Sequence, residues 1–127
     1  MEFAIEYGGD PQDVTLTLRG VADAAEIARC NRALVSDDRF RAGLAILCDC
    51  TALQTTVDSQ EVTDAMVASI NARDWQHPPR AIAYLVADEK AAEPFSLFRA
   101  HLGGSRSQRR VFVSRQDALD WLRTTKL

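Results

Sequence analysis

Asp58 and Ser59 are the first residues whose types and spacing could serve a regulatory chemistry. They lie in the stretch T-T-V-D-S-Q-E-V, from Thr55 to Val62, next to an apolar-periodic segment. If Asp58 is a helix N-cap, its carboxylate accepts from early backbone N–H groups, while Glu61 reaches back to the cap. Ser59 then needs no role. If Ser59 is instead a switch, an added phosphate would change how the helix start meets a partner.

Asp49 is expected to end the strand formed by the apolar run L-A-I-L-C, which begins at Leu44. Ligand sites of open α/β sheets collect where strands end, so a carboxylate there could orient a ligand or accept a phosphate. The competing interpretation is that Asp49 hydrogen-bonds the backbone of a following turn, T-A-L-Q-T-T. Acids in such positions usually serve the local backbone, which favours the second interpretation.

The stretch H-L-G-G-S-R-S-Q-R-R, from His101 to Arg110, offers groups that bind anions. Its glycines free the backbone to approach an anion, and Ser105, Arg106 and Arg109 supply donors together with Arg110. The spacing matches neither a P-loop nor a dinucleotide fingerprint. The alternative is a helix C-cap, a solvated turn and an edge strand protected by charge.

The cysteines and histidines follow no catalytic or metal-binding pattern. Cys48 and Cys50 are two residues apart on an expected strand, so they point the same way and are badly placed for an unstrained disulfide. Because neither C-x-x-C spacing nor a nearby histidine accompanies them, we expect no metal and no cofactor. Cys30 is an expected core residue, and His77 and His101 are expected to be structural or exposed. We therefore expect no catalytic residues and no enzyme activity.

The length and the amino-acid composition of the chain are those of a globular domain. Hydrophobic residues make up 46% of the 127 residues and charged residues 26%. A chain of this length forms one domain, residues 1–127, and folding buries about two thirds of the surface that the unfolded chain exposes. The opening M-E-F-A-I-E matches neither a signal peptide nor a membrane anchor. With an odd number of cysteines, this predicts a cytoplasmic protein with free thiols and no membrane insertion.

Charge is distributed unevenly along the chain. Residues 1–64 hold 12 acids and 5 bases, a balance of -7, while residues 65–127 hold 6 acids and 10 bases, a balance of +4. This asymmetry permits an acidic partner or self-association. The net charge of -3 argues against general nucleic-acid binding.

Hydrophobic periodicity indicates alternating strands and helices. Alternating residues at 3–7 and 14–18, on either side of G-G-D-P, predict a half-buried hairpin. Continuous apolar runs from Leu44 and Ala81 predict strands covered on both faces, and V-F-V at 111–113 predicts a shorter strand.

Helical patterns occupy four segments. Apolar faces recur at 27–34, at 62–70 and at 118–122, and a further helix is expected at 95–102 before Gly103. Asp23 and Ser114 each precede an acid by three residues, as N-caps do. The order is β-β-α-β-α-β-α-β-α. It predicts an α/β fold with a mixed, mostly parallel sheet, an N-terminal antiparallel hairpin and four helices.

Four phrases, L-T-L-R-G-V-A-D-A-A-E-I, S-D-D-R-F-R-A-G, L-C-D-C-T-A-L and Q-D-A-L-D-W-L, are spread over most of the chain. Together with the order of elements, they resemble the STAS domains and especially the SpoIIAA-like proteins related to the sporulation anti-anti-sigma factor. The resemblance implies a SpoIIAA-like (STAS-like) fold. It also implies a noncatalytic regulatory or protein-interaction module.

In the anti-anti-sigma members, a serine in an Asp-Ser-Ser-Gly stretch is phosphorylated by a partner kinase, which controls docking. The matching stretch here is Asp58-Ser59-Gln60-Glu61, which lacks the second serine and the glycine. The resemblance thus implies a candidate switch or docking site at Asp58 and Ser59, to which we add Asp49. The expected partner is a protein, which could be a second copy in a homodimer. The alternative function is binding of a small anionic or lipid-like ligand near the strand ends and the loop 101–110.

Overall fold

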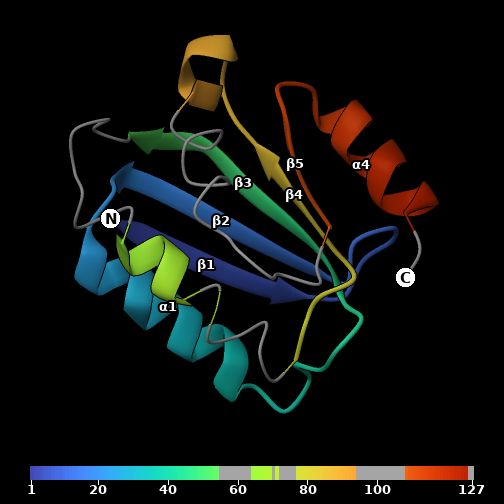
Figure 1. Ribbon diagram of the computed structural model, residues 1–127, viewed down its shortest axis with the longest axis horizontal. Helices are drawn as coiled ribbons and strands as arrows, with labels where there is room; N and C mark the ends of the chain where they lie inside the picture. Colours follow the sequence, from blue (N-terminus) through green and yellow to red (C-terminus); the bar gives the residue numbers. More distant parts are fainter. Residues whose placement is uncertain (55–63, 70, 72–76, 94–107, 126–127) are drawn as a thin grey trace.

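The computed structural model describes residues 1–54, 64–69, 71, 77–93 and 108–125. Its five strands form one sheet in the order β1-β2-β3-β4-β5 (Figure 1). The strands are β1 (Glu2–Tyr7), β2 (Val14–Val21), β3 (Ala45–Gln54), β4 (Ala81–Leu85) and β5 (Gln108–Phe112). β1 pairs antiparallel with β2, and the other neighbours pair in parallel. This confirms the predicted mixed, mostly parallel sheet with an N-terminal antiparallel hairpin.

Helices occupy the four predicted places in the chain order. α1 (Ala24–Ser36) connects β2 to β3, and α4 (Arg115–Thr124) follows β5. Helical residues at 64–69 and 71 lie between β3 and β4, and others at 89–93 lie between β4 and β5. The expected helix at 95–102 falls outside the described residues. No helix of the described part has both the length and the apolar character that crossing a membrane requires.

β5 differs from its prediction. V-F-V predicted a strand at 111–113, whereas β5 begins at Gln108 and ends at Phe112. Pairing with β4 sets these limits, since Gln108 is opposite Ala81 and Phe112 is opposite Leu85. Hydrophobicity alone could not reveal the polar first half of this strand.

Both predicted caps that the structure describes are formed. The Asp23 side chain accepts from the Glu26 backbone N–H at 3.0 Å, and the Ser114 hydroxyl accepts from the Asp117 N–H at 3.3 Å. Each cap satisfies a backbone donor that the first helical turn leaves free. An acid in the first turn also interacts favourably with the positive end of the helix dipole.

The tight turn between β1 and β2 depends on glycine. Gly8 and Gly9 have φ angles of 101° and 140°, in the region that side chains with a Cβ rarely adopt. The Gly8 N–H donates to the Asp13 carbonyl at 2.8 Å, which closes the turn. A Cβ on Gly9 would lie 2.9 Å from the Gln12 carbonyl oxygen, so a larger residue does not fit there.

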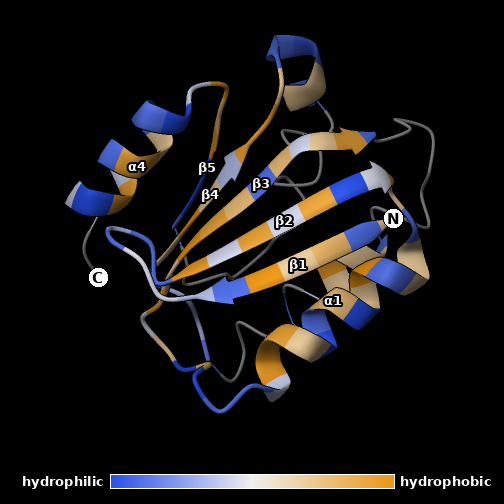
Figure 2. Cartoon of the chain, turned by 180° about the vertical axis from the view of Figure 1, so that it is seen from behind, coloured by the Kyte–Doolittle hydropathy of each residue, from blue (hydrophilic) through white to orange (hydrophobic). Residues whose placement is uncertain are grey.

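Alternate residues of the central strands pack on opposite faces of the sheet. On one face, Ile46 and Tyr84 belong to a core that includes Leu34 of α1. On the other face, Leu47 and Leu122 belong to a second core under α4. Figure 2 shows the same alternation along β2, where hydrophobic residues alternate with more polar ones. The two helices therefore cover opposite faces, as a strand-helix alternation requires.

Candidate functional site

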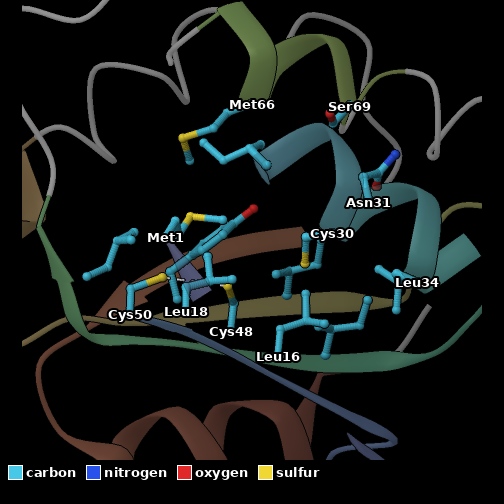
Figure 3. A pocket seen from close by; sticks show the side chains of 15 residues that line it. Met1, Leu16, Leu18, Cys30, Asn31, Leu34, Cys48, Cys50, Met66 and Ser69 are labelled. Atoms are coloured by element: carbon cyan, nitrogen blue, oxygen red, sulfur yellow. Dashed lines mark hydrogen bonds between the residues drawn. The ribbon is translucent and has the colours of Figure 1, made fainter. Parts of the chain in front are cut away.

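A pocket of about 80 Å³ lies between the sheet and α1 (Figure 3). Its floor is formed by inward residues of β2, β3 and β4, among them Leu16, Cys48 and Tyr84. α1 contributes one wall, including Leu34, and the helical residues 64–69 contribute another through Met66. Elements that are far apart in the sequence thus meet around one space.

The described residues that line this pocket are mostly apolar, and none of them has a charged side chain. Its polar side-chain groups belong to Asn31, Ser69 and Tyr84. The Asn31 Oδ1 atom is buried and has no hydrogen-bond partner among the described residues. Asn31 and Ser69 lie toward the same end of the pocket in Figure 3. The pocket can therefore hold an apolar body and offers few polar contacts.

A bulge in β3 shapes the pocket floor. Thr17 of β2 is opposite Asp49, but the next aligned pair is Arg19 with Ala52. β3 therefore has two residues, Cys50 and Thr51, where β2 has one. Such a bulge bends the strand and re-aims its side chains. An unbroken alternation from Cys48 and Cys50 would place Leu53 on the other face of the sheet. Because of the bulge, Leu53 instead points into the pocket.

The thiols of Cys48 and Cys50 are neighbours in the pocket. Their Sγ atoms lie 3.6 Å apart, and all three cysteines are buried and form no disulfide. This confirms the prediction of free thiols. The hydrogen bond with Cys48 raises the pKa of the Cys50 thiol well above its ordinary value, and burial raises it further. Cys50 is therefore protonated at neutral pH and is a poor nucleophile.

Asp49 lies on the opposite face of the sheet from the pocket. Its carboxylate accepts from the Thr51 N–H at 3.0 Å and from the Thr51 hydroxyl at 2.7 Å, and it pairs with Arg115 of α4 at 2.9 Å. The prediction that Asp49 ends its strand is wrong. β3 continues to Gln54 because β2 extends alongside it as far as Val21. Asp49 does bond the local backbone, as the second interpretation expected, but its partner Thr51 is in the strand and not in a turn.

The candidate anion site is only partly described. Ser105 and Arg106 lie outside the described residues, as do Asp58 and Ser59. Arg109 is 9% exposed and is paired with Ile82, so it lies on the pocket side of the sheet without lining the pocket. Arg110 is exposed, and its guanidinium lies 5.4 Å from the centre of the Phe112 ring. Arg109 and Arg110 are neighbours on β5, so the two described arginines of the candidate anion site point to opposite faces of the sheet.

Sequence patterns missed the pocket as a site. They placed Ile27, Cys30 and Leu34 on one helical face, and all three line the pocket. The sulfur-containing residues are the feature of the sequence that could have indicated this pocket. The chain has three cysteines and two methionines, and all five line it. Among the described residues, no group of three or more His, Cys, Asp or Glu is placed to hold a metal ion.

The fold is similar to that of a solved structure. It is the crystal structure of an uncharacterized protein from the DUF3478 family, with a SpoIIAA-like fold, from Shewanella loihica PV-4. The two chains superpose with a TM-score of 0.63 at 15% identity, over 95% of this chain and 92% of that one. At this identity the likeness establishes the fold, so the chain has the SpoIIAA-like fold that its sequence phrases implied. No family model and no curated protein matches the sequence.

Proposed function

We propose that the chain is a cytoplasmic, noncatalytic binding module of the SpoIIAA-like fold. Its ligand is a small, neutral, apolar molecule held between α1 and the sheet. The observation that supports this proposal is the lining of the pocket, where none of the 15 described residues that contribute has a charged side chain. Pockets with a predominantly apolar wall and a few polar groups are typical of small-molecule sites.

Energetics favour a neutral ligand over an anionic one. Each square ångström of apolar surface that a ligand buries contributes roughly 25 cal/mol. An anion would lose its hydration in this pocket without gaining a counter-charge from the described lining side chains, which costs several kcal/mol or more. Of the two ligand types that the sequence left open, the lipid-like one is therefore better supported.

The chemistry of the pocket supports binding without catalysis. Cys50 is the kind of residue that could act as a nucleophile, but its raised pKa keeps it in the unreactive thiol form. Asn31, Ser69 and Tyr84 line the pocket without a histidine or a carboxylate, which would be the bases able to activate a hydroxyl group.

A titration of the isotope-labelled protein tests the proposed function. Toluene and methylcyclohexane serve as probes, and backbone amide signals of α1 and β3 report binding. We expect saturable shifts in the wild type. Ser69→Leu should abolish them by filling the pocket, whereas Ala68→Leu should keep them because Ala68 is exposed on the same helical segment. Failure of both probes to bind the wild type would refute the proposal.

Binding of a protein partner is the second function, and the SpoIIAA-like fold supports it. If Asp58 is a cap, Asp58→Ala should destabilise the domain by about 0.5 to 2 kcal/mol and Ser59→Ala should be nearly silent. Chemical denaturation measures both effects. A phosphopeptide from residues 55–62 that is recovered from the native organism and absent from a Ser59→Ala strain would instead establish the switch.

The homodimer is a separate expectation. Light scattering gives the mass in solution, and a dimer has twice the 14.1 kDa of one chain. A mass of one chain at every concentration reached would contradict self-association and would leave a different protein as the partner.

A further inference from the structure

All five sulfur-containing side chains of the protein converge on one pocket. Cys48 and Cys50 lie on its floor, Cys30 on the α1 wall, and Met1 and Met66 close the other end. Figure 3 shows these labelled side chains around the same space. Because the chain has sulfur at no other position, the pocket lining differs in chemistry from the rest of the core.

Sulfur distinguishes aromatic from aliphatic ligands. A polarizable sulfur atom about 5 Å from an aromatic ring, often at the ring edge, contributes roughly 0.3 to 1.5 kcal/mol. A saturated hydrocarbon of the same size gains only ordinary dispersion from the same contact. Tyr84 adds an aromatic ring to the floor, and aromatic pairs contribute about 0.5 to 1.5 kcal/mol beyond the area they bury.

The volume limits the size of the ligand. A buried water needs a space of about 10 to 15 Å³, and the pocket volume of about 80 Å³ is several times larger. A space of this size favours a small molecule with at most one ring over a long acyl chain.

From these observations we infer that the pocket selects a neutral molecule with a single aromatic ring over an aliphatic molecule of the same size. This inference rests on the proposed function and names the chemical class of its ligand. Among the described lining residues no side chain carries a charge that would pair with an aromatic ion, and the sulfur atoms supply the preference for a ring.

Dissociation constants for toluene and methylcyclohexane test the inference, because both molecules have one ring and the same number of carbons. The measured quantity is the change in the ratio of the two constants from wild type to variant, so the different hydration free energies of the two probes cancel. Met66→Leu replaces a pocket thioether by a side chain of nearly equal volume. It should shift the ratio about two- to tenfold toward methylcyclohexane.

Leu18→Met is the matched reverse variant, because it adds a sulfur to the same pocket. It should shift the ratio toward toluene. If both probes bind but neither variant changes the ratio, the sulfur atoms do not select the ligand and the inference fails while the proposed function stands. If neither probe binds the wild type, the proposed function fails and the inference fails with it.

Discussion

The two faces of the sheet are packed in different ways. On the α4 side, Ala45, Ala81 and Ala83 meet Ala118 of the helix. On the α1 side, the same strands present larger side chains such as Ile82 and leave a pocket of about 80 Å³. Small side chains let a helix approach a sheet closely, whereas larger and irregular ones hold it away and leave space between them. One sheet thus provides both a close-packed face and a face able to accept a ligand.

Polar contacts reinforce this difference. Arg80 Nη1 donates to the Thr125 carbonyl at 2.6 Å at the C-terminal end of α4, and Arg115 pairs with Asp49 at the N-terminal end. The α4 helix is therefore attached to the sheet at both ends. On the other face, the Tyr7 hydroxyl donates to the Leu34 carbonyl of α1 at 2.9 Å. The comparison suggests that stability depends more on the α4 face and ligand binding on the α1 face.

The largest expected effect is at Leu122, whose side chain is fully buried under α4. Leu122→Ala should destabilise the protein by about 2 to 5 kcal/mol, because the close-packed face cannot collapse around the lost volume. Urea denaturation measures the change. Leu119→Ala is the control, since Leu119 is only partly buried against the same core and should cost less. An effect of Leu122→Ala below that of Leu119→Ala would contradict the comparison.

Added volume should separate the two faces directly. Ala118→Leu should cost about 1 to 3 kcal/mol, because Ala118 is fully buried and larger side chains force their neighbours to move. Cys30→Leu on the pocket wall should change stability by less than about 1 kcal/mol, because the pocket accepts the extra atoms. Thermal and urea unfolding of both variants provide the measurement. Equal costs would mean that the two faces are packed alike.

Asp49 and Arg115 test the attachment of α4. Asp49→Ala removes two hydrogen bonds to Thr51 as well as the ion pair and should cost about 1 to 2 kcal/mol. Arg115→Ala should cost less than about 1 kcal/mol, because the arginine side chain is 53% exposed. Urea denaturation of the two single variants and of the double variant gives the coupling free energy between Asp49 and Arg115. If Arg115→Ala costs more than Asp49→Ala, the local bonds to Thr51 are not the main role of Asp49.

The smallest effect concerns pH and the pocket thiol. Cys50 has a raised pKa in the folded protein, so the unfolded chain loses this proton first as the pH rises past its ordinary value of 9.0. The contribution of the protonated Cys50 thiol to the free energy of unfolding is therefore fully present below pH 9.0. It is lost as the pH rises toward the pKa of Cys50 in the folded protein. Urea midpoints between about pH 9 and pH 10 should fall more steeply for the wild type than for Cys50→Ala. If the urea midpoints of the wild type and of Cys50→Ala fall in parallel as the pH rises, the Cys50 thiol does not contribute to the pH dependence of stability.

Much of the fold could be predicted because its signals are local. The alternation of Phe3, Ile5 and Tyr7 has the period of a half-buried strand, and the apolar run from Leu44 has the pattern of a covered one. The caps at Asp23 and Ser114 depend on side-chain bonds to backbone groups three residues away. Residues so close in sequence meet in any helix start, so no tertiary information was needed.

The positions of Asp49 and Arg109 in the sheet could not be predicted from the residues next to them in the sequence. The apolar run stopped at Asp49, but pairing with β2 carried β3 on to Gln54. Arg109 belongs to a charged stretch, yet β5 places it on a buried position beside Ile82. In both cases pairing with the neighbouring strand decided the outcome, and the residues of one strand do not show by themselves how far that pairing extends.

The sequence by itself determined the order of the elements and the helix starts at Asp23 and Ser114, because periodicity and short-range hydrogen bonds act within a few residues. The SpoIIAA-like fold was implied by the resemblance of four sequence phrases. Only the tertiary structure decided that Cys30, Cys48 and Cys50 share a pocket with Met1 and Met66. Their convergence requires the bulge in β3 and the placement of α1 and residues 64–69 over one face of the sheet. A pocket is the space that packed elements leave between them, and it exists only once those elements meet.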